Sequence, residues 1–500
     1  MRMWTIKGVI GMIRTTRSCT VAHGERGAVA AGHPLAAAAA SAILTRGGNA
    51  VDAMIAAQAV ICAVMPQAAG VGGDMLALVH SFGTTRAITG TGMSPARAPE
   101  RYATDGGTSI TVPGIVDAWA TAAHLFGSLP LADSLQEAIR LCDEGIAVDA
   151  PLAASVEAQR SRLVRHGAAD WPLLRRAEGE RWRQPELARL LRSIAAHGPR
   201  AFYRGSAAEA IANAVTRQGG TLDTTDLEAH STPVTDPVVC DWAGGRLSVQ
   251  PPPTQGALLA MVAHALDRLA KVDADNLQHV LVELTEAAFA HRDSAARGAD
   301  LLNERLDIDL ERAQNRGGPR SYLHTAGIAV ADSDGMVVSS LVSVFDDFGS
   351  GVLVPELGIV LNNRAGGFTA GHNAPGPARR PVHTLAPALL ALPGGDVLAL
   401  ATPGADGQVQ TLIQVLARMR FGGDPIDTAI AAPRWRSQDG DLLIEEDHDD
   451  AGDLHRRGHD VNPRPAGDDL FGAVVAAGIA DGRPFAAADW RRQTTTGAAR

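Results

Sequence analysis

Apolar residues recur along the first half of the chain with the spacing of amphipathic helices. Residues 33–65 are rich in alanine and aliphatic side chains and predict two helices, separated by a break at Gly47-Gly48-Asn49. From about residue 115 to residue 300 helical periodicity continues between short loops, for example at residues 131–145 and 186–197. This half therefore predicts a mainly helical layer.

The pattern changes to that of β-strands in the second half of the chain. Residues 328–331 and 337–345 are apolar and rich in β-branched side chains. The turn Asp332-Ser333-Asp334-Gly335 between them predicts a hairpin, because an Asp-Gly step accepts positive φ angles. Residues 352–361 and 397–401 predict further short strands. We find no internal repeat, so both halves are expected to share one sandwich of helices and sheets.

The segment before the hairpin has the composition of a loop. Residues 296–324 are rich in Arg, Asn and Gly and show no periodicity, and a flexible loop is where a chain is most easily cut. If the bond between His324 and Thr325 is broken, the Thr325 hydroxyl gains a free α-amine beside it. That amine can act as the general base that a weak hydroxyl nucleophile needs. Without cleavage, Thr325 is an ordinary threonine at the start of a strand.

Composition narrows the class of partner. With 500 residues, of which 46% are hydrophobic, the chain can bury one large core or two to three smaller ones. Its 45 Lys and Arg against 55 Asp and Glu give a net charge of -10, which argues against non-specific binding to nucleic acid or an anionic membrane. The apolar run at residues 8–13 is short and ends at Arg14, and no stretch has the ~18 apolar residues of a membrane span. We expect a cytoplasmic protein with a small-molecule partner.

Several familiar chemistries lack their motif in this sequence. There is no GxSxG elbow, no GxxxxGK[ST] loop and no HExxH helix. The four cysteines are far apart and show no CxxC spacing. His455 and His459 lie four positions apart near acidic residues, but their segment also fits an exposed helix that ends at Gly458. We therefore expect no metal and no organic cofactor.

Gly- and Pro-rich motifs occur in a fixed order between Ala28 and the carboxyl end. They are Gly32-His33-Pro34-Leu35-Ala36, Gly47-Gly48-Asn49-Ala50-Val51-Asp52-Ala53, Val112-Pro113-Gly114, Ala201-Phe202-Tyr203, Pro251-Pro252-Pro253, the hairpin from Thr325, Phe348-Gly349-Ser350-Gly351 and Gly358-Ile359-Val360-Leu361-Asn362-Asn363. In this order they resemble the gamma-glutamyltransferase family of N-terminal nucleophile hydrolases. The resemblance implies an α+β fold, the four-layer αββα sandwich, and self-cleavage between His324 and Thr325.

The resemblance also implies a division of the chain and of the catalytic work. Residues 1–27 would be a poorly ordered extension, residues 28–324 a large subunit and residues 325–500 a small subunit, with both subunits in one intertwined domain. Ser343 would offer a hydroxyl to the nucleophile, although an outward-facing strand residue is the alternative. Two processed heterodimers can also associate as a homodimer, and the sequence leaves this question open.

The oxyanion hole is implied by Thr402-Pro403-Gly404-Ala405, which stands where the family has Ser-Pro-Gly-Gly. The backbone N–H groups of Gly404 and Ala405 would stabilise the developing negative charge. Alanine serves as well as glycine here because the backbone donates, but a required positive φ would strain Ala405.

Departures from the family pattern fall on the residues that recognise the glutamyl group. The family's Arg is replaced by a threonine, its Asn, Gln and Asp by three other residues, and its paired serines by His and Thr. The residues found here are Thr91, Phe345, Arg364, Gly367, His383 and Thr384.

The loss of an acid at Gly367 and the gain of Arg364 favour an anionic substrate over an ammonium, because a guanidinium can bind a carboxylate through two hydrogen bonds. The motif Asn363-Arg364-Ala365-Gly366-Gly367-Phe368 looks like the family branch that includes oxamate amidohydrolase. We therefore expect an amidohydrolase that acts on a small amide carrying a carboxylate.

Alternatives remain at each level. Arg364 can be a structural ion-pair partner instead of a substrate ligand, and His383 a satisfied core histidine. The enzyme can be a true gamma-glutamyl transferase or hydrolase that acts on glutathione-like substrates. The presence of His324 before Thr325 also leaves open an unprocessed, non-catalytic member that serves as a binding or structural subunit.

Overall fold

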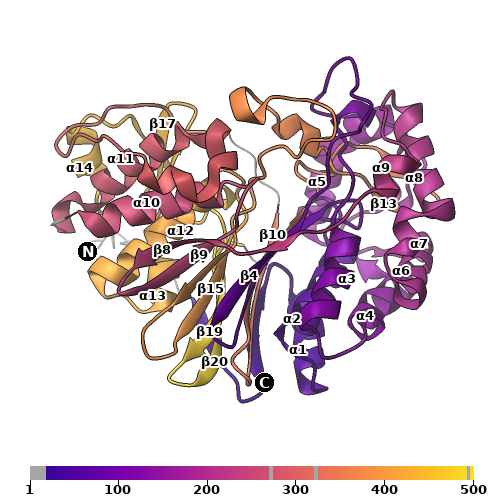
Figure 1. Ribbon diagram of the computed structural model, residues 1–500, viewed down its shortest axis with the longest axis horizontal. Coiled ribbons are helices and arrows are strands. Elements are labelled where there is room, and N and C mark those ends of the chain that lie inside the picture. Colours follow the sequence, from indigo (N-terminus) through magenta and orange to yellow (C-terminus); the bar gives the residue numbers. More distant parts are fainter. Residues whose placement is uncertain (1–18, 270–273, 320–324, 493–495, 500) are drawn as a thin grey trace, which may run out of the picture.

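Two antiparallel sheets, each with seven strands among the described residues, form the centre of the molecule (Figure 1). The computed structural model describes residues 19–269, 274–319, 325–492 and 496–499. The first sheet has the strand order β21 (Thr496–Ala499), β2 (Gly27–Ala31), β10 (Ala326–Asp332), β11 (Val337–Ser343), β3 (Asp74–Ser81), β4 (Thr84–Gly90) and β7 (Val234–Thr235). The second has the order β1 (Thr20–His23), β20 (Arg483–Ala488), β19 (Val475–Ala480), β15 (Val397–Ala401), β14 (Ala388–Ala391), β9 (Gly245–Val249) and β8 (Val238–Trp242).

The two sheets face each other across a core of small apolar side chains. Leu76 and Leu78 of the first sheet pack in one cluster with Leu389 and Ala399 of the second. The helices α1 (Pro34–Thr45) and α2 (Ala50–Val64) share a core with the outer face of the first sheet. The helices α10 (Gly256–Arg268), α11 (Leu277–Phe289) and α12 (Gly407–Ala417) do the same on the second sheet. Figure 1 shows the two groups of helices on opposite sides of the strands, which confirms the expected α+β, four-layer αββα sandwich.

Further elements enlarge the two helical layers. Around the first sheet lie α3 (Ile115–Phe126), α4 (Leu131–Glu144), α5 (Ala150–Arg165), α6 (Pro185–His197), α7 (Arg200–Tyr203), α8 (Gly205–Arg217) and α9 (Thr224–Glu228), with the short strands β5 (Ile146–Ala147), β6 (Arg181–Trp182), β12 (Leu353–Val354) and β13 (Ile359–Val360). Around the second lie α13 (Ile426–Ala431), α14 (Ala451–Arg456) and the small sheet of β16 (Trp435–Gln438), β17 (Asp441–Glu445) and β18 (Val461–Arg464).

Local signals explain why the helix predictions succeed. The break at Gly47-Gly48-Asn49 separates α1 from α2, and Asn49 caps α2 through a capping box with Asp52. Every residue of α2 is buried, which explains an almost continuous apolar sequence without a polar face. The predicted helices at residues 131–145 and 186–197 appear as α4 and α6.

Strands were predicted less well than helices. The hairpin appears as β10 and β11, but residues 352–361 form only the two-residue strands β12 and β13, because the chain turns between them at Pro355 to Gly358. The strands β8 and β9 lie inside a region that the sequence marks as helical. The start of the loop expected at residues 296–324 belongs instead to the 3-10 segment η4 (Arg292–Asn303). The end of that loop, residues 320–324, lies outside the described residues.

The amino-terminal boundary was placed too late. The expected extension at residues 1–27 includes β1, which pairs in register with β20 from Thr20 opposite Ala488 to His23 opposite Phe485. These backbone hydrogen bonds make β1 the edge of the second sheet, so the described part of that segment belongs to the fold.

No helix among the described residues is both long and apolar enough to cross a membrane.

Candidate active site

Four strands of the first sheet end along one line, and each brings a polar residue to it. Strand register pairs Ala326 with Val342, which places Thr325 opposite Ser343 at the end of the hairpin. Ser343 is in turn opposite Asp74, and Thr91 follows the end of β4 next to Asp74. All four side chains are buried. The antiparallel register therefore gathers residues that are far apart in the sequence.

Glycine allows the close packing behind this line. A Cβ on Gly73 would lie 2.5 Å from the carbonyl oxygen of Ser343, and one on Gly72 would lie 2.2 Å from that of Val360. No larger residue fits at either position, which explains the Gly-Gly-Asp sequence that delivers Asp74 to the site.

Thr325 and Ser343 form the candidate nucleophile pair. The Thr325 hydroxyl donates to Ser343 Oγ over 3.4 Å, a long hydrogen bond. Ser343 Oγ also accepts from the backbone N–H of Phe345 over 2.9 Å, which holds the hydroxyl in place. Phe345 adopts a φ of 86°, a backbone conformation that residues other than glycine rarely adopt. Ser343 thus faces the interior rather than outward, and His324 lies outside the described residues.

The segment that contains Gly404 and Ala405, residues 402–407, is called the oxyanion loop below after the role that the family resemblance implies for it. Gly404 has a φ of 122° and Ala405 one of 48°, so the strain anticipated for an alanine at this position is present. Neither backbone N–H donates a hydrogen bond to any described residue. The Gln255 side chain anchors the loop, because its amide nitrogen donates to the carbonyls of Thr384 and, over 2.8 Å, Ala405.

Asp74, Arg364 and His383 form a fully buried charge cluster behind the nucleophile pair, called the Asp74 cluster below. Arg364 Nε donates to Asp74 Oδ2 over 3.2 Å, and His383 Nε2 lies 3.3 Å from the same oxygen. Arg364 also stacks on the Phe345 ring, with its guanidinium carbon 4.3 Å from the ring centre. Its two terminal nitrogens have no hydrogen-bond partner among the described residues.

His383 is the neutral member of the cluster. Its Nδ1 accepts from the backbone N–H of Leu385 over 3.1 Å, so the ring proton sits on Nε2 and points to Asp74. Burial, reinforced by the charge of Arg364, lowers the pKa of His383 from 6.5 to about 4, and Asp74 opposes the shift only in part. Both ring nitrogens therefore have a protein partner.

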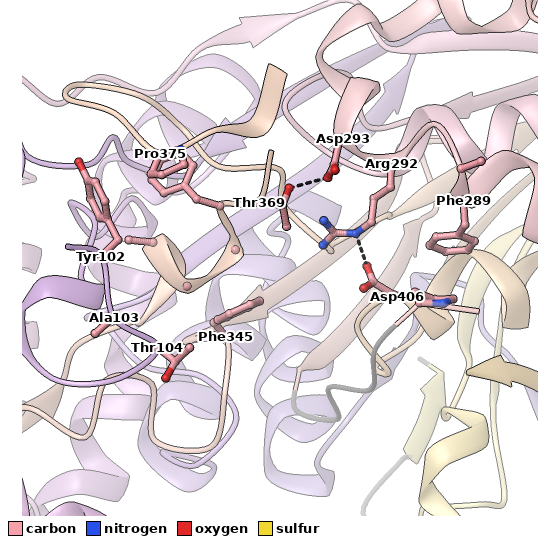
Figure 2. A pocket seen from close by; sticks show the side chains of 16 residues that line it. Tyr102, Ala103, Thr104, Phe289, Arg292, Asp293, Phe345, Thr369, Pro375 and Asp406 are labelled. Carbon is pink, nitrogen blue, oxygen red and sulfur yellow. Dashed lines mark hydrogen bonds and ion pairs between the residues drawn. The ribbon is translucent and has the colours of Figure 1, made fainter. Parts of the chain in front are cut away.

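A pocket of about 650 Å³ is lined by Phe345 and Asp406, although neither Thr325 nor Ser343 is among its lining residues (Figure 2). Phe345 and the backbone at Gly366 and Gly367 form one wall, and Asp406, the next residue after Ala405, belongs to the other. Pro319, the last residue described before the expected cleavage position, also lines it. Of the predicted substrate-contacting residues only Phe345 lines the pocket. The others, Thr91, Arg364, His383 and Thr384, are buried behind its walls.

Sequence reasoning missed Arg292, which also lines the pocket. It follows α11 and begins η4, and its Nε donates to Asp406 Oδ1 over 3.1 Å. Next to it, Asp293 accepts a hydrogen bond from the Thr369 hydroxyl (Figure 2). No motif spacing marks this Arg-Asp step, and the only sequence signal is its place directly after an apolar helix.

Another polar cluster lies away from the pocket and contains one of the two histidines considered for metal binding. His459 approaches His279 and Glu283 of α11, whereas His455 does not join them. The polar atoms are already engaged, because His279 Nδ1 lies 2.8 Å from His459 Nε2 and Glu283 accepts from the backbone of Gln314. Glu283 also pairs with the Arg316 guanidinium over 2.9 Å. These contacts fasten the segment that leads to Thr325 onto α11.

The αββα sandwich, with a threonine directly before a central strand, is the arrangement of an N-terminal nucleophile hydrolase. The gamma-glutamyltranspeptidase family model matches residues 36–499, and the chain belongs to this family. Family membership places it among enzymes that act on C–N bonds.

Individual relatives cover most of the chain. It is 34% identical to the oxamate amidohydrolase proenzyme of Klebsiella pneumoniae, over 82% of this chain and 84% of the relative. It is 32% identical to the glutathione hydrolase-like YwrD proenzyme of Bacillus subtilis, over 82% and 85% respectively. Among solved structures, cephalosporin acylase from Bacillus halodurans matches with a TM-score of 0.88 and 28% identity, over 100% of this chain and 99% of that one.

Proposed function

We propose that this protein is a self-cleaving amidohydrolase whose nucleophile is Thr325 and whose substrate is an amide that carries a carboxylate. The observation that carries the proposal is the buried hydroxyl pair of Thr325 and Ser343 at the start of β10. The oxyanion loop supports it, because Gly404 and Ala405 have N–H groups that no described residue uses. The relatives are named as proenzymes, which agrees with processing into two subunits from one precursor.

Cleavage would precede catalysis and would use the same hydroxyl. Thr325 Oγ attacks the carbonyl carbon of His324, the peptide nitrogen leaves as the new α-amine of Thr325, and water hydrolyses the resulting ester. The products are a large subunit that ends at His324 and a small subunit that begins at Thr325. In the mature enzyme the α-amine can accept the hydroxyl proton. A threonine inside a chain has no such amine, because its nitrogen is part of a peptide bond.

Amide hydrolysis would follow in two steps. Thr325 Oγ attacks the substrate carbonyl while the α-amine accepts the proton, and the N–H groups of Gly404 and Ala405 stabilise the oxyanion. The leaving nitrogen takes the proton and departs as ammonia or an amine, which leaves an acyl ester on Thr325. Water then attacks the ester, releases the carboxylic acid and restores the hydroxyl. Every step uses groups of this chain, the substrate and water.

The anionic substrate class is supported by the positive groups on both sides of Phe345. Arg364 stacks behind the ring, and Arg292 lies in the pocket in front of it. We propose that Phe345 contacts the substrate, while the Asp74 cluster, Thr91 and Thr384 hold the wall from behind. The relative named oxamate amidohydrolase also has an anionic amide in its name.

The proposal is tested by intact mass spectrometry together with a panel of amides. Purified protein should contain a fragment that begins at Thr325, and oxamate and longer carboxylated amides should be hydrolysed. A chain that stays uncut, or a Thr325→Ala protein that still hydrolyses the amide, would refute the mechanism. Faster turnover of a gamma-glutamyl anilide than of any carboxylated amide that lacks an α-ammonium group would instead favour a glutathione-type hydrolase.

A further inference from the structure

The pocket contains a cation that the catalytic steps above do not use. Arg292 is only 15% exposed, and a single nitrogen, Nε, is engaged with Asp406. Its two terminal nitrogens make no hydrogen bond with a described residue. Figure 2 shows them pointing into the pocket, toward the space between Thr369 and Phe345. A planar fork with two free donors is the group that binds a carboxylate best.

A second guanidinium, that of Arg436, lies near enough to Asp406 to feel its charge. Arg436 packs against the same loop, since a Cβ on Gly407 would lie 2.7 Å from its Nη1. Its Nε and Nη2 have no partner among the described residues, and burial lowers its pKa to about 10 although Asp406 opposes this. Arg436 therefore stays charged at neutral pH. Asp406 engages only Nε of Arg292 among the described residues and also lies in the field of Arg436, so the terminal nitrogens of Arg292 are able to pair with a second anion.

The remaining acid of the pocket does not occupy Arg292. Asp293 accepts its hydrogen bond from the hydroxyl of Thr369, on the other side of the opening (Figure 2). Arg364, in contrast, is completely buried behind Phe345 and does not line the pocket. Among the described residues that line the pocket, Arg292 is thus the cation that a ligand would meet.

The size of the pocket limits where the anion sits on the substrate. About 650 Å³ lies within the range of roughly 300–1,000 Å³ that encloses drug-sized ligands, and oxamate fills only a small part of such a space. Asp406 directly follows Ala405 in the sequence, and its carboxylate holds Arg292. A carboxylate on Arg292 and a carbonyl at the oxyanion loop would therefore belong to one molecule in which several bonds separate the two groups.

We propose that Arg292 is the specificity-determining residue that binds the substrate carboxylate, and that the substrate is an amide whose carboxylate lies several bonds from the scissile carbonyl. This inference rests on the proposed function for the identity of the scissile bond. The binding of a dicarboxylate, which is the product of such a reaction, depends only on the pocket.

The test compares processed wild-type protein with Arg292→Met, Arg292→Lys and the control Arg297→Met. Arg297 lies on the same segment, pairs with Glu304 and does not line the pocket, so its replacement removes equal charge elsewhere. Calorimetry measures the binding of adipate. Initial rates compare adipamate with hexanamide, an amide of the same length without the carboxylate.

We expect Arg292→Met to weaken adipate binding by about 10- to 100-fold and to raise the KM for adipamate by a similar factor, since a charge-assisted hydrogen-bond pair is lost. Hexanamide turnover by Arg292→Met should fall by a smaller factor than adipamate turnover, because the lost pair with Asp406 affects both substrates alike. The Arg297→Met protein should stay within about twofold of wild type on both substrates. Arg292→Lys should bind adipate with intermediate affinity, because it retains the charge without the fork. This variant carries the test if Arg292→Met does not fold.

Equal adipate binding by wild type and Arg292→Lys or Arg292→Met would overturn the inference, as would an equal loss of adipamate and hexanamide turnover. If Arg364→Met weakens adipate binding more than Arg292→Met does, the anion binds at the Asp74 cluster, and this result would also overturn the inference. Failure of the proposed function looks different: no amide is hydrolysed by wild type, whereas adipate binding still depends on Arg292.

Discussion

Replacing Gln255 with leucine should damage catalysis by releasing the oxyanion loop. The side-chain amide of Gln255 joins two buried carbonyls, those of Thr384 and Ala405. The Ala405 carbonyl also accepts from the backbone N–H of Gln408 over 3.1 Å, whereas no other described residue donates to the carbonyl of Thr384. Leucine fills a similar volume and donates nothing. Losing two hydrogen bonds, one of which leaves a buried acceptor unpaired, costs about 2–4 kcal/mol of stability.

The effect on rate follows from what Gln255 holds. Removal of a whole oxyanion donor typically lowers kcat by about 10²- to 10³-fold. Gln255→Leu leaves the N–H groups of Gly404 and Ala405 in place but frees the loop from one anchor, so we expect a smaller loss of about 10- to 100-fold in kcat with little change in KM. Self-cleavage should slow as well, because it requires the same oxyanion donors.

Gln250→Leu is the matched control. Gln250 is equally buried, and its amide also makes two hydrogen bonds, to Ile88 and Thr89, but it does not contact the oxyanion loop. Thermal unfolding should show similar losses of stability in both variants. The assays are ammonia release from a carboxylated amide and the rate at which the Thr325 fragment appears in intact mass spectra. If both variants lose kcat by the same factor, or Gln255→Leu loses none, the loop-anchoring argument is refuted.

The remaining predictions concern the nucleophile and the Asp74 cluster. Thr325→Ala should give an uncut chain without amide hydrolysis, and a fragment boundary at residue 325 in its mass spectrum would contradict the assignment. Asp74→Asn should cost about 3–5 kcal/mol, because it leaves the charge of Arg364 buried without a partner, and Arg364→Met in the same protein should restore part of the loss in urea unfolding. The folded protein resists protonation of His383, whose pKa falls from 6.5 to about 4, so its contribution to stability is complete above pH 6.5 and is lost as the pH falls toward 4. Unfolding temperatures of His383→Gln should therefore depend less on pH in this window than those of wild type, and equal slopes would exclude a contribution from His383.

Local features could be predicted from the sequence because their causes are local. The helix break before Asn49 and the hairpin turn at Gly335 depend on residues that touch each other along the chain. Thr325 could be proposed as the nucleophile from the sequence as well, since it stands where a loop meets a strand, and this assignment stays a prediction. The strands β8 and β9 were missed because short strands in a helix-rich region have no periodicity of their own.

Pairings across the sheets could not be predicted, because they depend on register. Asp74 is 290 positions from Arg364 and 309 from His383, and nothing in the sequence shows that one carboxylate serves both. The sequence left open whether Arg364 contacts substrate or is a structural ion-pair partner, and the structure buries its guanidinium against Asp74 and Phe345. A role for Arg292 could not be predicted from the sequence either, because its partner Asp406 lies 114 positions away.

The candidate chemistry depends on both sheets at once. The hydroxyl pair of Thr325 and Ser343 comes from the end of the first sheet, whereas the oxyanion loop follows β15 of the second. A face-to-face sandwich brings these two ends together only if the layers keep their spacing, which the small side chains between the sheets allow. Gln255 precedes α10 on the second sheet and fixes Thr384 and Ala405 relative to each other, so the helix layer also determines the position of the oxyanion loop. Substitutions that enlarge the core between the sheets should therefore lower kcat before they unfold the protein.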